Sequence, residues 1–87
     1  MRIMYSILNI LYFNKARSKL YALTKEDITE ALASDGEKWS ERTIYNKIRA
    51  LEDRKFIEKG LSNSNTYYVT SEGINWMKEM EGDTENE

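Results

Sequence analysis

The segment 39–69 constrains the fold of this 87-residue chain more than any other part of the sequence. It opens with Ser40, a residue type that favours the start of a helix. Aliphatic residues then recur at helical spacing, at Ile44, Ile48 and Leu51. A short apolar run, a loop rich in Gly, Ser and Asn, and a second run of aromatic and β-branched residues follow. This order predicts a helix with one buried face, followed by a β-hairpin.

The opposite face of this predicted helix carries polar, basic and aromatic side chains. The residues that point away from the aliphatic stripe are Arg42, Tyr45, Asn46 and Arg49. Arginine can donate two hydrogen bonds to guanine, and asparagine can pair bidentately with adenine. We therefore predict that this face reads bases in the major groove of DNA. The alternative is an ordinary solvated helix face.

One local pattern recurs at three places and indicates a helix start each time. An apolar residue precedes Ser or Thr, and an isoleucine follows four residues after the hydroxyl. The three cases are Leu23-Thr24 with Ile28, Trp39-Ser40 with Ile44, and Val69-Thr70 with Ile74. This is the spacing of an N-cap hydroxyl with a hydrophobic staple around it. It also predicts that Asp27 completes a capping box and that Trp39 packs into the core.

The predicted elements give a mainly α-helical fold class with a small antiparallel β-hairpin. We expect helices over about 2–14, 25–33, 41–54 and 71–80, strands over about 56–59 and 66–69, and a short third strand near 20–23. The second and third helices, with the turn between them, form a helix-turn-helix. Because the hairpin that follows has the place of a wing, the predicted fold is a winged helix-turn-helix.

The residue types that the chain lacks restrict its possible chemistry. It contains no cysteine and no histidine, so disulfides, the usual zinc sites and histidine general bases are excluded. No glycine-rich phosphate loop and no nucleophile beside a base is evident in the sequence. We expect a protein that is not an enzyme and that uses no metal and no cofactor, although carboxylate chemistry is not excluded.

The apolar N-terminus raises the question of export or membrane insertion. Its sequence, MRIMYSILNILYF, is interrupted by Tyr5, Ser6 and Asn9, and no small-residue cleavage site follows it. No apolar run reaches the roughly 20 residues that span a bilayer. We therefore expect a cytoplasmic protein without a signal peptide and without membrane contact.

Charge is unevenly distributed along the chain. The net charge is −2, but residues 79–87 contain five acids and no base. Residues 1–78 contain 13 bases and 10 acids, which leaves them a net charge of +3. The sequence therefore predicts one modestly basic winged-helix DNA-binding domain over residues 1–80 and an acidic, disordered tail over residues 81–87.

Several polar side chains lie where a nucleic-acid backbone could pass. A basic connector follows the first predicted helix, and lysines stand near the starts of the next two helices, where the helix dipole also attracts phosphate. The candidates for phosphate contacts are Lys15, Arg17, Lys25, Lys38, Thr43, Lys47, Lys59 and Asn63. For the connector, a solvated loop that caps the first helix is an equally good interpretation.

The first predicted helix is apolar on more faces than one small core requires, which suggests contact with a second subunit. Trp76 also lies off the apolar stripe of the fourth helix, and aromatic residues are enriched in interface cores. We predict a two-fold dimer interface that includes Tyr5, Tyr12, Phe13 and Trp76. The alternative is that the first helix is central in one subunit, covered by the fourth helix and the hairpin.

Three motifs give the chain a family resemblance over about residues 3–80. They are Ser40-Glu41-Arg42-Thr43-Ile44-Tyr45, Leu51-Glu52-Asp53-Arg54-Lys55-Phe56-Ile57 and Tyr67-Tyr68-Val69-Thr70-Ser71-Glu72-Gly73. With them the chain resembles the winged helix-turn-helix regulators, especially the PadR-like and MarR-like families. The resemblance implies the winged-helix fold and DNA binding. Lys55 replaces the glycine usual in these families, and the predicted wing tip has no Arg or Lys.

These features together predict a sequence-specific transcriptional regulator that binds double-stranded DNA. We expect a repressor that acts as a homodimer on a two-fold operator, with the helix over about 41–54 in the major groove. The alternative is a protein–protein interaction module on the same fold, an adaptor or anti-regulator that does not bind DNA. The wing tip without basic residues and the acidic tail favour this alternative.

Overall fold

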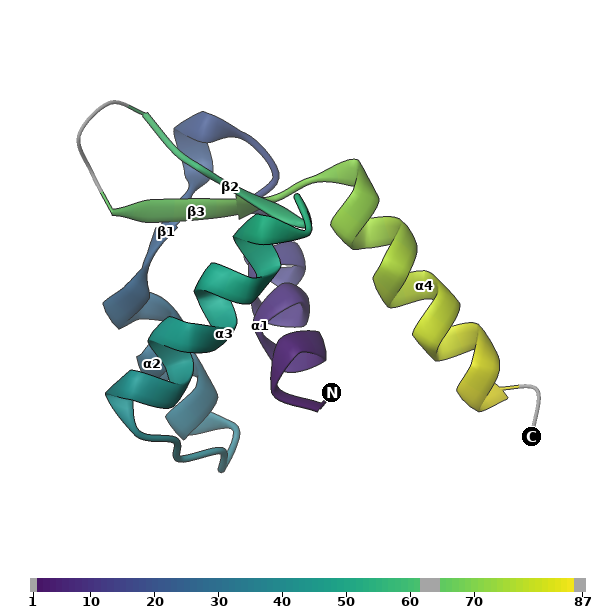
Figure 1. Cartoon of the computed structure of the whole chain (residues 1–87), viewed down its shortest axis with the longest axis horizontal. Helices are drawn as coiled ribbons and strands as arrows, with labels where there is room; N and C mark the ends of the chain where they lie inside the picture. The colour runs from purple at the N-terminus through teal and green to yellow at the C-terminus, as the bar shows by residue number, and fades with distance from the viewer. Residues whose placement is uncertain (1, 62–64, 86–87) are drawn as a thin grey trace.

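The chain folds into helices packed on one small sheet, and the computed structural model in Figure 1 describes its residues 2–61 and 65–85. The elements are α1 (Arg2–Phe13), the 3-10 turn η1 (Lys19–Tyr21), β1 (Leu23–Thr24), α2 (Lys25–Ser34), α3 (Glu41–Asp53), β2 (Ile57–Lys59), β3 (Thr66–Val69) and α4 (Ser71–Glu85). Helices α2 and α3 form the helix-turn-helix, and the β2–β3 hairpin forms the wing. The predicted fold class is confirmed.

Hydroxyl side chains begin three helices at the predicted positions. The Thr24 hydroxyl accepts a hydrogen bond from the Asp27 N–H at 3.0 Å, and the Asp27 carboxylate accepts one from the Thr24 N–H at 3.2 Å. This completes the predicted capping box. Ser40 and Thr70 each accept from the N–H three residues further on, at 3.2 and 3.1 Å. Each cap satisfies an N–H that has no partner within its helix.

The apolar residue beside the second cap does not pack as predicted. Trp39 is 42% exposed, so the expectation that it lies in the core is wrong. Its indole N–H donates to the carboxylate of Glu37 at 3.4 Å. Trp39 is not among the hydrophobic residues that pack against the core cluster, so the cap of α3 forms without this contact.

Two helices end with a lysine in the left-handed conformation. Lys15, after α1, and Lys55, after α3, both have a φ of 62°. The N–H of Phe56 returns to the Leu51 carbonyl at 3.0 Å, and the residue after Lys15 makes the equivalent bond at 2.8 Å. These are Schellman C-caps. Lys55 thus takes a backbone conformation that glycine adopts more easily, at a cost of about 1 kcal/mol.

The antiparallel sheet has the strand order β1-β3-β2. Tyr67 and Tyr68 alternate across β3 as predicted, with Tyr67 buried and Tyr68 half-buried. The third strand, expected near 20–23, starts later, because residues 19–21 form η1. Leu23 of β1 pairs with Tyr67, so the segment after α1 is tied to the wing.

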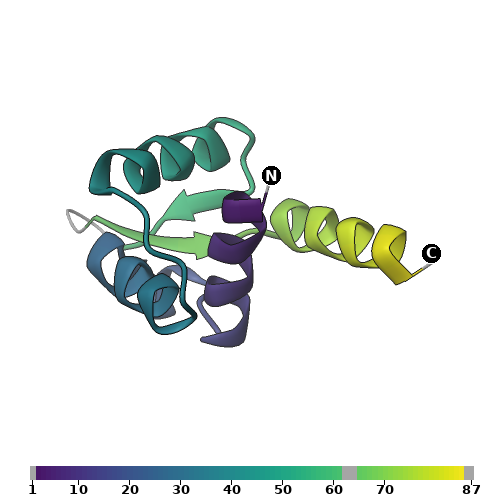
Figure 2. The ribbon, with the colours of Figure 1, turned by 90° about the horizontal axis from the view of Figure 1, so that it is seen from below.

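Helix α1 lies at the centre of the fold (Figure 2) and contacts α2, α3, α4 and β3. It buries the apolar residues Ile3, Met4, Ile7, Leu8, Ile10 and Leu11. These pack in one cluster with aliphatic residues of α2, α3 and the sheet, including Ile28, Leu32, Ile44, Ile48, Leu51, Ile57 and Val69. Much of the apolar surface of α1 is therefore covered within one subunit.

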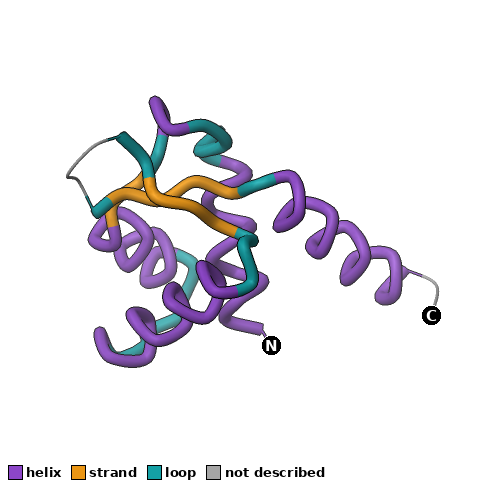
Figure 3. The backbone as a smooth tube through the Cα atoms, turned by 45° about the horizontal axis from the view of Figure 1, so that its top comes forward, coloured by secondary structure: helices purple, strands orange, loops and turns teal. Residues whose placement is uncertain are grey.

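Helix α4 continues past the predicted end of the fourth helix, as far as Glu85. The helix end predicted near residue 80 is therefore wrong, whereas the division into a domain and an acidic tail stays a prediction. Glutamate is a good helix former, and no proline follows to stop the helix. Figure 3 shows α4 projecting from the rest of the fold. None of the described helices combines the length and the hydropathy that crossing a membrane requires.

Candidate nucleic-acid interface

The outward face of α3 presents the four side chains predicted to read bases. Arg42, Tyr45, Asn46 and Arg49 are all exposed, while the aliphatic residues of the inner face are buried. Their spacing places them in one stripe along the helix. Residues 42–51 contain no acid, so this stretch of α3 offers a polyanion only cationic and neutral side chains.

Tyr45 brings together cations from two helices. The Arg49 guanidinium donates to the Tyr45 hydroxyl at 3.0 Å, and its carbon lies 5.8 Å from the centroid of the ring. The ammonium of Lys25, at the start of α2, lies 5.9 Å from the same centroid. The hydrogen bond to Tyr45 raises the pKa of Arg49. Contacts to one ring therefore position both cations before any ligand binds.

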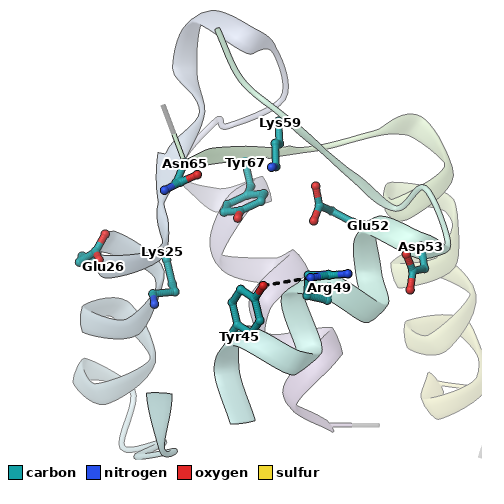
Figure 4. Close-up of a pocket in the computed structure, with 9 residues that line it drawn as sticks. All are labelled: Lys25, Glu26, Tyr45, Arg49, Glu52, Asp53, Lys59, Asn65 and Tyr67. Atoms are coloured by element: carbon teal, nitrogen blue, oxygen red, sulfur yellow. Dashed lines mark hydrogen bonds between the residues drawn. The ribbon is translucent and has the colours of Figure 1, made fainter. Parts of the chain in front are cut away.

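A groove of about 550 Å³ opens between α2, the outward face of α3 and the wing (Figure 4). Its lining residues are Lys25 and Glu26 of α2, Tyr45, Arg49, Glu52 and Asp53 of α3, and Lys59, Asn65 and Tyr67 of the wing. In Figure 4 the side chains of Lys59 and Tyr67 extend from the strands toward α3. The predicted recognition helix thus lies beside the wing, and one ligand can touch both.

The charge of this groove is mixed. Three bases and three carboxylates line it, so its formal charge is zero. Glu52 and Asp53 lie in the last turn of α3, whereas Arg42 and Asn46 lie in its first half, outside the lining. Residues 42–49, which follow Glu41 and contain no acid, are therefore the part of α3 best suited to a polyanion. In the described part of the chain, no group of acidic side chains is arranged to hold a metal ion.

Tyr67 lies on the wing side of the groove. It is 7% exposed, and burial is the main reason why its pKa is raised, followed by the charge of Glu52. The phenol is therefore protonated at neutral pH. It supplies a neutral hydrogen-bond donor beside the charged side chains.

The candidate phosphate contacts near α3 differ in their surroundings. Lys25 and Lys59 line the groove from opposite sides, α2 and the wing. Lys38 is exposed in the turn before α3, and Lys47 is half-buried. The hydroxyl of Thr43 is half-buried and accepts a hydrogen bond from the N-cap serine at 2.9 Å. Thr43 is thus already engaged in the helix cap.

The connector after α1 is separate from this groove. Lys15 and Arg17 are exposed, and they line a different hollow together with Tyr21. The Arg17 guanidinium carbon lies 5.2 Å from the ring centroid of Tyr12. The structure therefore does not bring these two cations to the face of α3. Asn63, the remaining candidate, lies outside the described residues.

The sequence prediction missed more than half of the groove lining. The missed residues are Glu26, Glu52, Asp53, Asn65 and Tyr67. Glu52 and Asp53 follow Arg49 by three and four residues, a spacing that places all three on neighbouring parts of one helix surface. That signal was present in the sequence. The wing residues could be placed only once the strand pairing was known.

All four residues predicted for a dimer interface have contacts within the chain. The Tyr5 hydroxyl donates to a carboxylate of α4 at 2.8 Å, which raises the pKa of Tyr5. Trp76 stacks on Phe56 with ring centroids 5.4 Å apart, and Tyr12 meets Phe13 edge-on at 5.9 Å. Phe13 itself is 72% exposed. The dimer stays a prediction, with Phe13 as the least covered of its four residues.

Comparison with known protein families agrees with this fold. A family model described as the ribonuclease R winged-helix domain matches residues 5–77, a span that contains α2, α3 and the wing. The match supports a winged helix but not the PadR-like or MarR-like families specifically. No curated protein and no solved structure matches the chain.

Proposed function

We propose that this chain, which belongs to the ribonuclease R winged-helix domain family, binds double-stranded DNA through the outward face of α3. The observation that carries the proposal is the acid-free stretch 42–51 with four exposed side chains able to contact DNA. Three of them can donate hydrogen bonds to base edges or phosphates, and Tyr45 holds Arg49 and Lys25 in place.

The charges along α3 define how DNA would approach. In helix-turn-helix proteins the N-terminal residues of the recognition helix contact base edges. Here that end carries one acid, Glu41, together with Arg42 and Asn46, whereas the last turn carries Glu52 and Asp53 and no base, and would repel phosphates. Lys25 and Lys59 line the groove beside α3, from α2 and from the wing, and are placed for backbone contacts. The first half of α3 therefore enters the major groove.

The family description names a ribonuclease, so duplex RNA is the natural competitor to DNA as a ligand. The major groove of A-form RNA is deep and narrow, and side chains cannot read it. The major groove of B-form DNA is about 12 Å wide and admits an α-helix. Reading through α3 therefore favours duplex DNA over duplex RNA of the same sequence.

At the level of biology, we propose a transcriptional repressor that acts as a homodimer by occupying a promoter. Two copies of α3 would then contact half-sites separated by about 10–10.5 base pairs or a multiple of that spacing. The projecting helix α4 supports a contact between subunits. In this role the chain binds and does not catalyse.

The test is a selection from random duplex DNA, read by sequencing. Enrichment of an inverted repeat is the expected result, because it reports sequence reading and two-fold symmetry together. Enrichment of a single half-site would support DNA reading and reject the homodimer. A library that stays random, with no retention of the protein on duplex DNA, would reject the proposal.

The mixed charge of the groove favours a second candidate, a protein–protein interaction module. Three carboxylates beside three bases suit a polar protein surface with both signs of charge better than they suit phosphates alone. Under this candidate the protein fails to bind heparin or random DNA and captures one defined protein partner. Glu52→Gln would then weaken that capture, whereas it would strengthen binding to DNA.

A further inference from the structure

The segment 13–21, which runs from the last residue of α1 through η1, exposes an unusual amount of apolar surface. Among the large hydrophobic residues in the described part of the chain, Phe13, Leu20 and Tyr21 are the three most exposed, at 72%, 70% and 62%. None of the three contributes to the groove beside α3. We call residues 13–21 the aromatic platform.

The platform is also strongly basic. Lys15, Arg17 and Lys19 alternate with other residues, and residues 1–25 contain no acid at all. A shallow hollow of about 540 Å³ lies on the platform and is lined by Asn14, Lys15, Arg17, Ser18 and Tyr21. The nearest acids that line a neighbouring hollow are Asp27 and Glu30, on the α2 side. The platform therefore combines exposed rings with cations and presents no carboxylate of its own.

The backbone of the platform is held in place although its side chains project. The Schellman cap after α1 fixes Lys15, and Ala16 is fully buried. The Ala16 carbonyl accepts a hydrogen bond from the Val69 N–H of β3 at 2.8 Å. A ligand that binds the exposed rings therefore does not have to order a loose loop. This lowers the entropic cost of binding.

The platform adjoins the wing. A Cβ added to Gly60, at the end of β2, would lie 3.2 Å from the Lys19 carbonyl oxygen of η1. The preceding residue, Lys59, already lines the groove beside α3. The platform therefore adjoins the wing that forms one side of the groove beside α3.

We propose, resting on the nucleic-acid binding proposed above, that the platform binds unpaired nucleotides next to a duplex. Phe13 and Tyr21 would stack on bases, while Lys15 and Lys19 would contact phosphates. Aromatic rings and cations on one surface are the usual means of binding single strands without sequence preference, because every base has a flat face. The absence of acids from residues 1–25 favours a polyanion over an apolar protein partner.

The experiment compares three labelled DNA probes by fluorescence anisotropy: a blunt duplex, the same duplex with a single-stranded overhang, and the overhang strand alone. The full chain should bind the overhang duplex more tightly than the blunt duplex. The variant with Phe13→Leu and Tyr21→Leu keeps apolar bulk and removes the rings. It should bind both overhang probes about 10-fold or more weakly than the unchanged chain, and the blunt duplex equally well.

Controls separate stacking from other causes. Leu20→Ala removes exposed apolar area without removing a ring and should leave all affinities unchanged. Because the substituted residues are exposed, thermal melting should be unaltered in every variant. RNA versions of the overhang show whether the platform distinguishes ribose from deoxyribose.

Each result decides between the two proposals. Equal overhang binding by the double leucine variant and the unchanged chain would overturn the platform and leave duplex binding by α3 intact. Overhang binding without any blunt-duplex binding would support the platform and overturn duplex binding by α3. A dimer in sedimentation velocity that the double leucine variant loses would show that a second copy covers the platform. Binding to phosphatidylserine vesicles but to no oligonucleotide would assign the platform to a lipid surface. The loss of a dimer and the binding to vesicles alone would each overturn the proposal.

Discussion

Helices α1 and α3 have nearly the same length, 12 and 13 residues, but they relate to the rest of the fold in opposite ways. Helix α1 buries six residues and contacts α2, α3, α4 and β3. Helix α3 buries three residues and turns a stripe of charged, polar and aromatic side chains outward. The first helix provides the core, and the third provides the surface that we assign to the ligand.

Stability and binding are therefore separable in this chain. The buried face of α3 attaches the helix to α1, whereas the residues of its outward face contact one another and the start of α2. Substitutions in α1 should therefore change the free energy of unfolding. Substitutions on the outward face of α3 should change the affinity for DNA without changing stability.

The largest effect is expected in the core. Leu8 of α1 is completely buried, and Leu8→Ala should lower the free energy of unfolding by about 2–5 kcal/mol, because it removes apolar contacts and leaves a cavity. Urea denaturation followed by circular dichroism measures the change. Tyr45→Ala, on the outward face of α3, is the control and should change stability little. Equal destabilisation by the two variants would remove the distinction between the helices.

The next effect concerns base reading. Arg42→Ala should weaken binding to a selected DNA site by about 1–3 kcal/mol and relax the base preference at one position. Arg2→Ala, at the exposed start of α1, is the matched control and should leave affinity unchanged. A gel-shift titration with the selected duplex measures both. If the two arginine variants bind alike, α3 does not read the site.

A smaller effect is expected for a phosphate contact. Lys25→Gln should weaken binding to all DNA sequences alike and reduce the slope of log affinity against log salt concentration by about 1. Lys78→Gln on α4 is the control, since Lys78 is exposed and lies away from the groove. Titrations at several salt concentrations provide the slopes. A loss of specificity without a change of slope would mean that Lys25 contacts a base instead.

The smallest effect tests the ends of the two helices. Lys55→Gly should raise the free energy of unfolding by about 0.5 kcal/mol, because the relief of left-handed strain exceeds the greater entropy of glycine in the unfolded chain. Lys15 has the same φ of 62° at the end of α1, so Lys15→Gly should have an effect of the same sign. Denaturant melts of both variants measure the difference. Destabilisation by either glycine would show that the lysine side chain contributes more than the strain costs.

The features that sequence reasoning found are local ones. The hydroxyls of Thr24, Ser40 and Thr70 begin helices through hydrogen bonds that span three residues, so their spacing alone predicts them. The outward face of α3 follows from the buried positions Ile44 and Ile48 in the same way.

The features that sequence reasoning missed depend on distant parts of the chain. Trp39 has the spacing of a staple residue, but it is not among the residues that pack against the core cluster. The stacking of Trp76 on Phe56 joins residues twenty positions apart, so helical spacing does not predict it. The acidic composition of residues 81–87 predicts a tail, but glutamate also favours helix, and α4 continues to Glu85. Strand pairing and packing between distant segments determine what such residues contact. The spacing of residues along one helix carries no information about these contacts.

The most direct test of binding through α3 is a map of the amides that DNA perturbs. The protein, labelled with ¹⁵N, is titrated with a selected duplex, and the shifts of each amide signal are followed by NMR. We predict the largest changes over residues 42–49, with smaller changes at Lys25 and Lys59 and almost none along α4. Changes confined to α1 and α4, with the signals of residues 42–49 unmoved, would contradict the account.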